Sequence, residues 1–375
     1  MSRSNFDSGG NARLTALGRS AYHQALDEGW ADYRRIHAES RRSRQFYDAS
    51  RETIAGVLGT STDNIHFAPS ATTAFHSSVA ALYAGRKRVG STAVASKVER
   101  SAILNALEFH GSSRLVGVDR EGRIDSGEFS AAVAEPGVAF AVAQHANHEV
   151  ATLQDLATIS DTARAAAVPL LVDATSSLGH IAAPSSHWDA FVANPADWGG
   201  VHGIGVLAVK PRTRVRFAWP EDQDGWFPGG VNLPAVFAAA VTLSEAESVR
   251  AERSKRQFAW IDDIRSAAAK IPQTMVVGSP SERLPHMSTF SFLYVDGEAI
   301  TTELDKFGFA VGSGSACTTA TLQPSHVLAA MGVLTQGNVR VALDSDITDA
   351  QVRRFIEVLP QAVNNVRQNL CVDFL

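Results

Sequence analysis

Two side chains in the last quarter of the chain could act on sulfur or on a carboxylate. Cys317 lies in a glycine- and serine-rich segment, VGSGSACTTATLQPSHVLAAMGV, at residues 311–333. A reactive cysteine is expected to be partly exposed with a lowered pKa, whereas an unreactive one is a small buried hydrophobe. Arg340 offers a planar guanidinium that matches a carboxylate through two hydrogen bonds, although a structural ion pair could use it as well.

Further polar residues follow short apolar runs. Asp173 ends the run LLVD, and in α/β sheets ligands bind at the carboxyl ends of strands. The run at residues 64–68 leads through PSATT into a helical stretch. The backbone N–H groups of such a turn form a site for an anion.

Asp197, His148 and Arg100 could also take part in chemistry. An aspartate before a glycine-rich turn often caps or hydrogen-bonds that turn. Asp197 could instead be a pocket carboxylate that, with Asp173, His148 and Arg100, binds a ligand or moves protons. We expect no metal, because no known ligand spacing supports a site made of His148 and the two aspartates.

Seven short apolar runs separated by helical stretches predict the elements that position these residues. Runs of this kind indicate βαβ units, and so an α/β fold with a mainly parallel seven-stranded sheet and helices on both faces. The expected strands are Asn64–Ala68, Ser91–Ala95, Arg114–Val118, Val138–Ala143, Pro169–Asp173, Asp189–Ala193 and Val206–Lys210, and two of the helices are Ser101–Phe109 and Asp155–Ala166.

A smaller α+β domain is expected in the C-terminal part of the chain. Ala235–Lys270 predicts a long connecting helix. Later strands are expected at Met275–Val277, Met287–Phe292, Ala310–Gly312 and Asn338–Leu343, and a final helix at Asp349–Gln368. We place the large domain at residues 14–248 and the small domain, which carries Cys317, at residues 1–13 and 249–375.

Composition narrows the classes of protein. The chain has 375 residues, 45% of them hydrophobic, which is enough for two domains. A net charge of −5 without a concentrated basic face disfavours a nucleic-acid partner. The sequence has neither an apolar run of about 18 residues nor an apolar N-terminal stretch, so we expect no membrane span and no signal peptide. The two cysteines, Cys317 and Cys371, cannot form a disulfide framework, which favours a cytoplasmic protein.

Segments from about residue 5 to residue 360 resemble the NifS/IscS-like cysteine desulfurases of the class V aminotransferase family, which have the fold-type I architecture of pyridoxal phosphate enzymes. Residues 311–333 resemble the loop whose cysteine takes sulfur from a substrate cysteine as a persulfide, which implies that role for Cys317. NVRVAL at 338–343 resembles the strand whose arginine binds the substrate carboxylate, here Arg340. LVDATSSLG and HFAPSATT resemble the segments whose aspartate pairs with the pyridine nitrogen and whose threonine contacts the phosphate, here Asp173 and Thr72.

The sequence departs from this family at the lysine that forms a Schiff base with the cofactor. That lysine lies a few residues before a Gly-hydrophobic-Gly strand entry, and the matching stretch here is NPADWGGVHGIG at residues 194–205. Asp197 then stands in place of the lysine, and Asn194 in place of a serine. No lysine occurs between Lys97 and Lys210. Because an aldimine needs an amine, we expect no covalently bound cofactor, and pyridoxal phosphate is implied by the resemblance alone.

Other cofactor contacts also differ from the family. Arg100 stands where a histidine stacks on the cofactor ring, and His148 where an asparagine faces the ring hydroxyl. Asn232 occupies the position of a threonine that, in the family, contacts the phosphate of the neighbouring subunit's site. The cofactor half of the expected site is therefore altered, whereas the sulfur half resembles the family. The resemblance also implies a homodimer.

Four functions stay open on these residues, and we favour the first two jointly. The first is a protein that accepts sulfur on Cys317 from an active desulfurase and passes it to an acceptor protein. The second is different chemistry in the old cofactor pocket, with Asp197, His148 and Arg100. The third is a non-catalytic pseudoenzyme that partners an active desulfurase. The fourth is an atypical pyridoxal phosphate-dependent desulfurase or aminotransferase.

Overall fold

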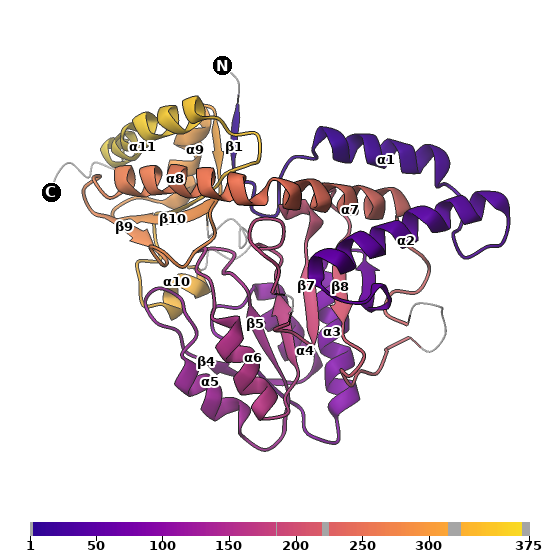
Figure 1. Cartoon of the computed structure of the whole chain (residues 1–375). Helices are drawn as coiled ribbons and strands as arrows, with labels where there is room; N and C mark the ends of the chain where they lie inside the picture. Colours follow the sequence, from indigo (N-terminus) through magenta and orange to yellow (C-terminus); the bar gives the residue numbers. More distant parts are fainter. Residues whose placement is uncertain (1–2, 185, 220–224, 314–323, 370–375) are drawn as a thin grey trace.

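The computed structural model describes residues 3–184, 186–219, 225–313 and 324–369. Its central feature is a seven-stranded sheet in the order β2-β8-β7-β6-β5-β3-β4 (Figure 1). Only β8 runs against the others within this sheet. The strands are β2 Ile65–Ala68, β3 Thr92–Ser96, β4 Ser112–Val116, β5 Val138–Gln144, β6 Leu170–Asp173, β7 Ala190–Ala193 and β8 Gly205–Val209. All seven expected strands are confirmed, with bounds shifted by one or two residues.

Helices pack on both faces of this sheet. On one face, residues of the second, fifth, sixth and seventh helices share a buried cluster with strand residues such as Phe191. On the other face, the third and fourth helices pack on the neighbouring strand position, Val192. Successive side chains of a strand point to opposite faces, so a strand buried on both faces needs apolar residues at every position. The helices are α1 Ala16–Glu28, α2 Ala38–Leu58, α3 Ala71–Arg86, α4 Ser101–His110, α5 Ser126–Val133, α6 Leu156–Ala165 and α7 Leu233–Ser248.

A second group of elements surrounds a smaller antiparallel sheet in the order β12-β10-β9. The N-terminal strand β1 pairs in parallel with β11, so the start of the chain joins elements that lie some 300 residues later (Figure 1). Phe6, Phe309 and Phe355 pack together in this core. The elements are β1 Ser4–Phe6, α8 Arg250–Ala268, β9 Thr274–Val277, β10 Met287–Phe292, α9 Gly297–Lys306, β11 Phe309–Val311, α10 His326–Ala330, β12 Asn338–Ala342 and α11 Asp349–Asn369, and the short 3-10 turns are η1 Thr62–Asn64 and η2 Pro195–Asp197.

The connection between the two groups differs from the expectation. The predicted single helix over Ala235–Lys270 is two helices, because the backbone of Val249 (φ −111°, ψ 3°) leaves the helical region between α7 and α8. Val249 also coincides with the boundary that we place between the large and small domains. That division stays our proposal, and the separate hydrophobic clusters of the two groups favour it.

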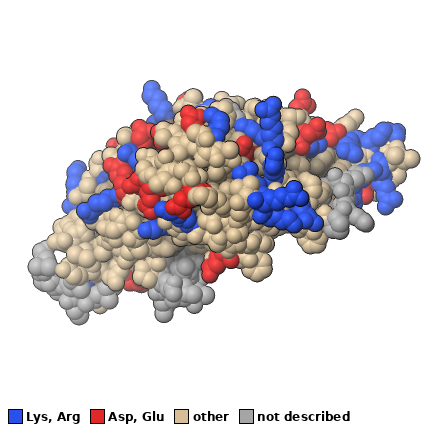
Figure 2. Space-filling view, turned by 90° about the horizontal axis from the view of Figure 1, so that it is seen from below, with Lys and Arg blue, Asp and Glu red and all other residues tan. Residues whose placement is uncertain are grey.

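Two surface properties bear on possible partners. No helix in the described part of the chain is long and apolar enough to cross a membrane. Seen from below, the molecule mixes acidic and basic side chains, with Lys and Arg gathered near the middle of that face (Figure 2).

Candidate functional site

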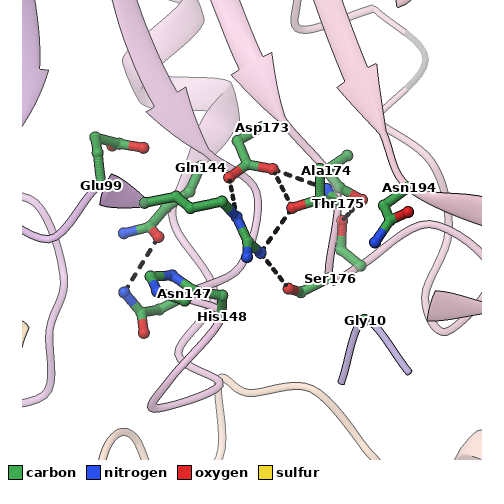
Figure 3. Close-up of polar contacts among 12 residues, drawn as sticks. Gly10, Glu99, Gln144, Asn147, His148, Asp173, Ala174, Thr175, Ser176 and Asn194 are labelled. Atoms are coloured by element: carbon green, nitrogen blue, oxygen red, sulfur yellow. Dashed lines mark hydrogen bonds and ion pairs between the residues drawn. The ribbon is translucent and has the colours of Figure 1, made fainter. Parts of the chain in front are cut away.

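The candidate site lies at the carboxyl edge of the large sheet. Gln144 and Asp173 are paired at the ends of β5 and β6, and Asn194 follows β7 directly. Because parallel strands end at the same edge of a sheet, the segments that follow them converge there, and Figure 3 shows His148, Asp173, Ser176 and Asn194 at this edge. Asp173 therefore lies at the carboxyl end of its strand, as expected, and its place in a ligand site stays our prediction.

An ion pair occupies the centre of this site. Arg100 precedes α4, and its Nε lies 3.4 Å from Oδ2 of Asp173, whose side chain is 3% exposed. The Nη2 of Arg100 donates to the hydroxyls of Thr175 at 2.8 Å and Ser176 at 3.0 Å (Figure 3). The other oxygen of Asp173 accepts from the backbone N–H and the hydroxyl of Thr175, at 2.8 and 2.6 Å. Both carboxylate oxygens of Asp173 are therefore bonded within the chain.

Asp197 is buried, with 2% of its surface exposed. Its Oδ1 accepts from the backbone N–H of Gly10 at 3.0 Å, and its Oδ2 lies 3.4 Å from Nδ2 of Asn194. The 3-10 turn η2, which contains Asp197, is capped by Asn194, which accepts from the N–H of Ala196. The two side-chain contacts of Asp197 go to Gly10 and Asn194, and neither is with the glycine-rich turn that follows it. Burial raises the pKa of Asp197 to about 7, although Arg100 and the N–H of Gly10 oppose the shift.

Arg340 and His148 connect the small sheet to this edge. The Nη2 of Arg340 lies 2.9 Å from Oδ1 of Asp7, and its Nη1 donates to the backbone carbonyl of His148 at 3.2 Å. Arg340 thus forms a structural ion pair, which was the alternative that we considered to binding a substrate carboxylate. Burial lowers the pKa of His148 well below its usual value, and the charges of Arg100 and Arg340 act in the same direction. The imidazole of His148 is therefore neutral at pH 7.

Two buried acids beside the site were not identified from the sequence. Ser96 donates to Glu99 at 2.8 Å, and Ser325 donates to Glu149 at 2.8 Å. Burial raises the pKa of Glu99 to about 8 and also raises that of Glu149. The sequence did hold a local indication of both acids. Each acid lies between a valine and a residue that we had identified as a candidate, Arg100 or His148. With a pKa of about 8, Glu99 is mostly protonated at neutral pH, and burial disfavours the ionised form of Glu149.

Two further expected site residues, Thr72 and Asn232, have no described contact with this cluster. Thr72 is exposed in the first turn of α3, where Ser70 provides the cap. Asn232 caps α7 by accepting from Ala235, and it lines a separate hollow between residues 25–34 and 229–234. Cys317 lies outside the described residues.

The described ends of the segment that contains Cys317 do reach the site. Gly312 exchanges backbone hydrogen bonds of 2.9 and 2.7 Å with Arg340. Ser325 contacts Glu149, and the imidazole Nε2 of His326 lies 2.9 Å from the backbone carbonyl of Glu99. Gly312, Ser325 and His326 therefore lie beside the candidate site.

The chemistry of these side chains does not fit covalently held pyridoxal phosphate. The buried group in the turn after β7 is the carboxyl of Asp197, and a carboxyl cannot form a Schiff base. Asp173, which the resemblance pairs with the pyridine nitrogen, has both oxygens bonded, one of them to Arg100. Across the described ranges, no group of three or more His, Cys, Asp or Glu side chains could hold a metal ion.

Comparisons with known proteins show the family of this chain. The model of the family described as "Aminotransferase class-V" matches residues 7–355. Cysteine desulfurase IscS 1 of Archaeoglobus fulgidus is 29% identical over 349 residues, covering 88% of this chain and 89% of the relative. A cysteine desulfurase of Nostoc sp. is 30% identical over 332 residues, covering 85% and 82%.

Solved structures show the same architecture. A NifS-like protein superposes with a TM-score of 0.89 at 20% identity, covering 97% of this chain and all of the other. DndA from Streptomyces lividans superposes with a TM-score of 0.76 at 20% identity, covering 88% and 97%. At these identities the likeness concerns the fold alone.

Proposed function

The chain belongs to the class V aminotransferase family, and from this premise we propose that it is a cysteine desulfurase-like protein that handles sulfur without a Schiff base of its own. The observation that carries the proposal is the ion pair of Arg100 with Asp173, reinforced by Thr175 and Ser176. In this pair, Asp173 is already bonded to Arg100 and is not available to pair with a cofactor ring. The position that would need a lysine amine holds the buried carboxyl of Asp197 instead.

In the proposed function, Cys317 carries the sulfur. Its thiolate attacks the terminal sulfur of a donor persulfide, so that a new S–S bond forms on Cys317 and the donor's S–S bond breaks. The donor leaves as a thiolate and takes up a proton, and no net oxidation occurs. The donor is a protein or small-molecule persulfide that an active desulfurase supplies. The position of Gly312 and Ser325 beside Arg340 and Glu149 supports a segment that serves this site.

The test is a sulfur-transfer assay with an active desulfurase and cysteine as the source. Mass analysis after alkylation should show one added sulfur atom on Cys317 of the wild type and none on Cys317→Ala. Cys371→Ala is the matched control and should accept sulfur like the wild type. The protein with free cysteine and pyridoxal phosphate, but without the desulfurase, should release no sulfide. Equal sulfur uptake by Cys317→Ala and the wild type would contradict the proposal.

A second candidate function is acid–base chemistry at Asp197. Its buried carboxyl, with a pKa of about 7, is poised both to give and to accept a proton near neutral pH. His148 and Arg100 then bind or orient the reacting molecule. Carbon-13 NMR of labelled aspartate should show one carboxyl that titrates near neutrality and vanishes in Asp197→Asn. Titration of Asp197 at an ordinary aspartate pKa, about 4, would remove this candidate.

A further inference from the structure

A cationic cavity lies at the edge of the large sheet opposite the candidate site. The parallel strands β6 and β7 begin there, at Leu170 and Ala190, and the antiparallel β8 ends there at Val209. The cavity has a volume of about 290 Å³. Its charged lining consists of five cationic side chains and one carboxylate, namely Arg86, Arg164, Lys210, Arg212, Arg214 and Asp189.

A single carboxylate, Asp189, stands against the five cations of this lining. Its Oδ2 accepts from the backbone N–H of Leu170 at 2.9 Å. Arg164 is paired with Asp161, whereas Arg86, Arg212 and Arg214 form no ion pair within the described ranges. Burial lowers the pKa of Arg86, the charge of Arg214 lowers it further, and the charge of Asp189 raises it. The lining keeps an excess of positive charge, which a bound anion would offset.

Trp188 lies under the ammonium of Lys210 in this cavity. Trp188 is 2% exposed, and the ammonium lies 4.4 Å from the centre of its ring and 3.4 Å from the carbonyl oxygen of Ser186. The Nη2 of Arg86 donates to the carbonyl of Ala167 at 3.0 Å. The indole N–H of Trp188 and the Nε of Arg86 have no hydrogen-bond partner among the described residues, but both atoms are fully buried. The groups that can contact a ligand are therefore the outer nitrogens of the cationic side chains, and Arg212 and Arg214 are exposed.

We propose that this cavity binds a phosphoryl group, either as free phosphate or as part of a small phosphomonoester. Guanidinium groups and N–H donors match phosphate oxygens in charge and geometry. The volume of the cavity is close to the lower end of the range for small-molecule sites. Together with the net charge of −5, this favours a small ligand over an extended polyanion. The site does not depend on the function proposed above.

The test is calorimetric titration at low ionic strength with inorganic phosphate and, separately, with glycerol 3-phosphate, because salt screens such contacts. Arg214→Ala should weaken binding roughly tenfold, the loss expected for one charge-assisted hydrogen bond. Arg88→Ala is the matched control, since it removes an exposed positive charge near the end of α3 without lining the cavity. Both arginines are exposed, so thermal unfolding without ligand should be unchanged.

A second readout uses the ring of Trp188, which lies 4.4 Å from the ammonium of Lys210. Trp188→Phe identifies the indole signal of this residue. In NMR spectra, the indole signal that disappears in this variant should shift when phosphate is added to the wild type. Tighter binding of the ester would identify an organic ligand, and equal binding would identify phosphate itself. Equal losses in Arg88→Ala and Arg214→Ala, or no saturable binding of either probe, would overturn the proposal.

Discussion

An Arg100→His/Asp197→Lys double variant should bind pyridoxal phosphate covalently, whereas Asp197→Lys alone should bind it far less. Asp197→Lys supplies the missing amine, but Arg100 still holds Asp173 at 3.4 Å and bonds Thr175 and Ser176. A ring that must pair with Asp173 has to displace this guanidinium. If the displaced contacts are worth at least about 1.4 kcal/mol, the affinities of the two variants differ by at least about tenfold.

The measurement is a visible absorbance spectrum after adding pyridoxal phosphate, followed by borohydride reduction and mass analysis of the adduct. Arg100→His alone is the matched control, because it opens Asp173 but provides no amine. The wild type should also give no adduct. Equal adduct formation by Asp197→Lys and the double variant would show that Arg100 does not obstruct the cofactor. A reducible adduct on the wild type would show that another amine serves the site.

The fold was predictable where local pattern and burial agree. The strands β5 to β8 are apolar at nearly every position, because both faces of the sheet are covered by helices. The boundary at Val249 was not predictable, since both flanking stretches have helical patterns and only the backbone of one residue departs from them. The amino-acid composition of a segment does not reveal that the backbone of one residue leaves the helical region.

The site was predictable in position but not in its internal contacts. Asp173 was placed at the carboxyl end of a strand, and Asp197 was grouped with Asp173, His148 and Arg100 as a possible pocket. The bond between Arg100 and Asp173 joins residues 73 positions apart. It depends on the rotamer of a long side chain, which spacing in the sequence does not determine. The contact of Asp197 with Gly10 likewise depends on how the N-terminal segment passes the sheet edge.

A stacked pair of buried histidines beneath Asp197 should make the protein sensitive to acid. The rings of His180 and His286 lie 3.6 Å apart and nearly parallel, at 12°. Nε2 of His180 contacts the carbonyl of Asp197 at 3.0 Å, so it carries the proton of a neutral ring. Neither nitrogen of His286 has a hydrogen-bond partner among residues that the structure describes. Burial lowers the pKa of His180 to about 3 and that of His286 well below its usual value.

The direction of the pH effect follows from these lowered values. The unfolded chain binds protons at both histidines as the pH falls below about 6.5, whereas the folded chain does not until far lower pH. The stability that the pair contributes is therefore present above that pH and is lost as the pH falls towards 3. Glu99 and Asp197 act in the opposite sense, because their raised pKa values remove stability as the pH rises from about 4 to 8. Only a comparison of variants isolates the histidines.

His286→Phe should separate these contributions, because it keeps a ring against His180 and removes one titrating group. Between about pH 7.5 and about pH 5, the wild type should lose about 2 kcal/mol more unfolding free energy than the variant does. Denaturant unfolding at a series of pH values measures this difference directly. His202→Phe, at an exposed position, is the matched control and should keep the dependence of the wild type. Parallel curves for His286→Phe and the wild type would mean that His286 is protonated in the folded protein, and its ring would then need an acceptor that the stacked arrangement does not provide.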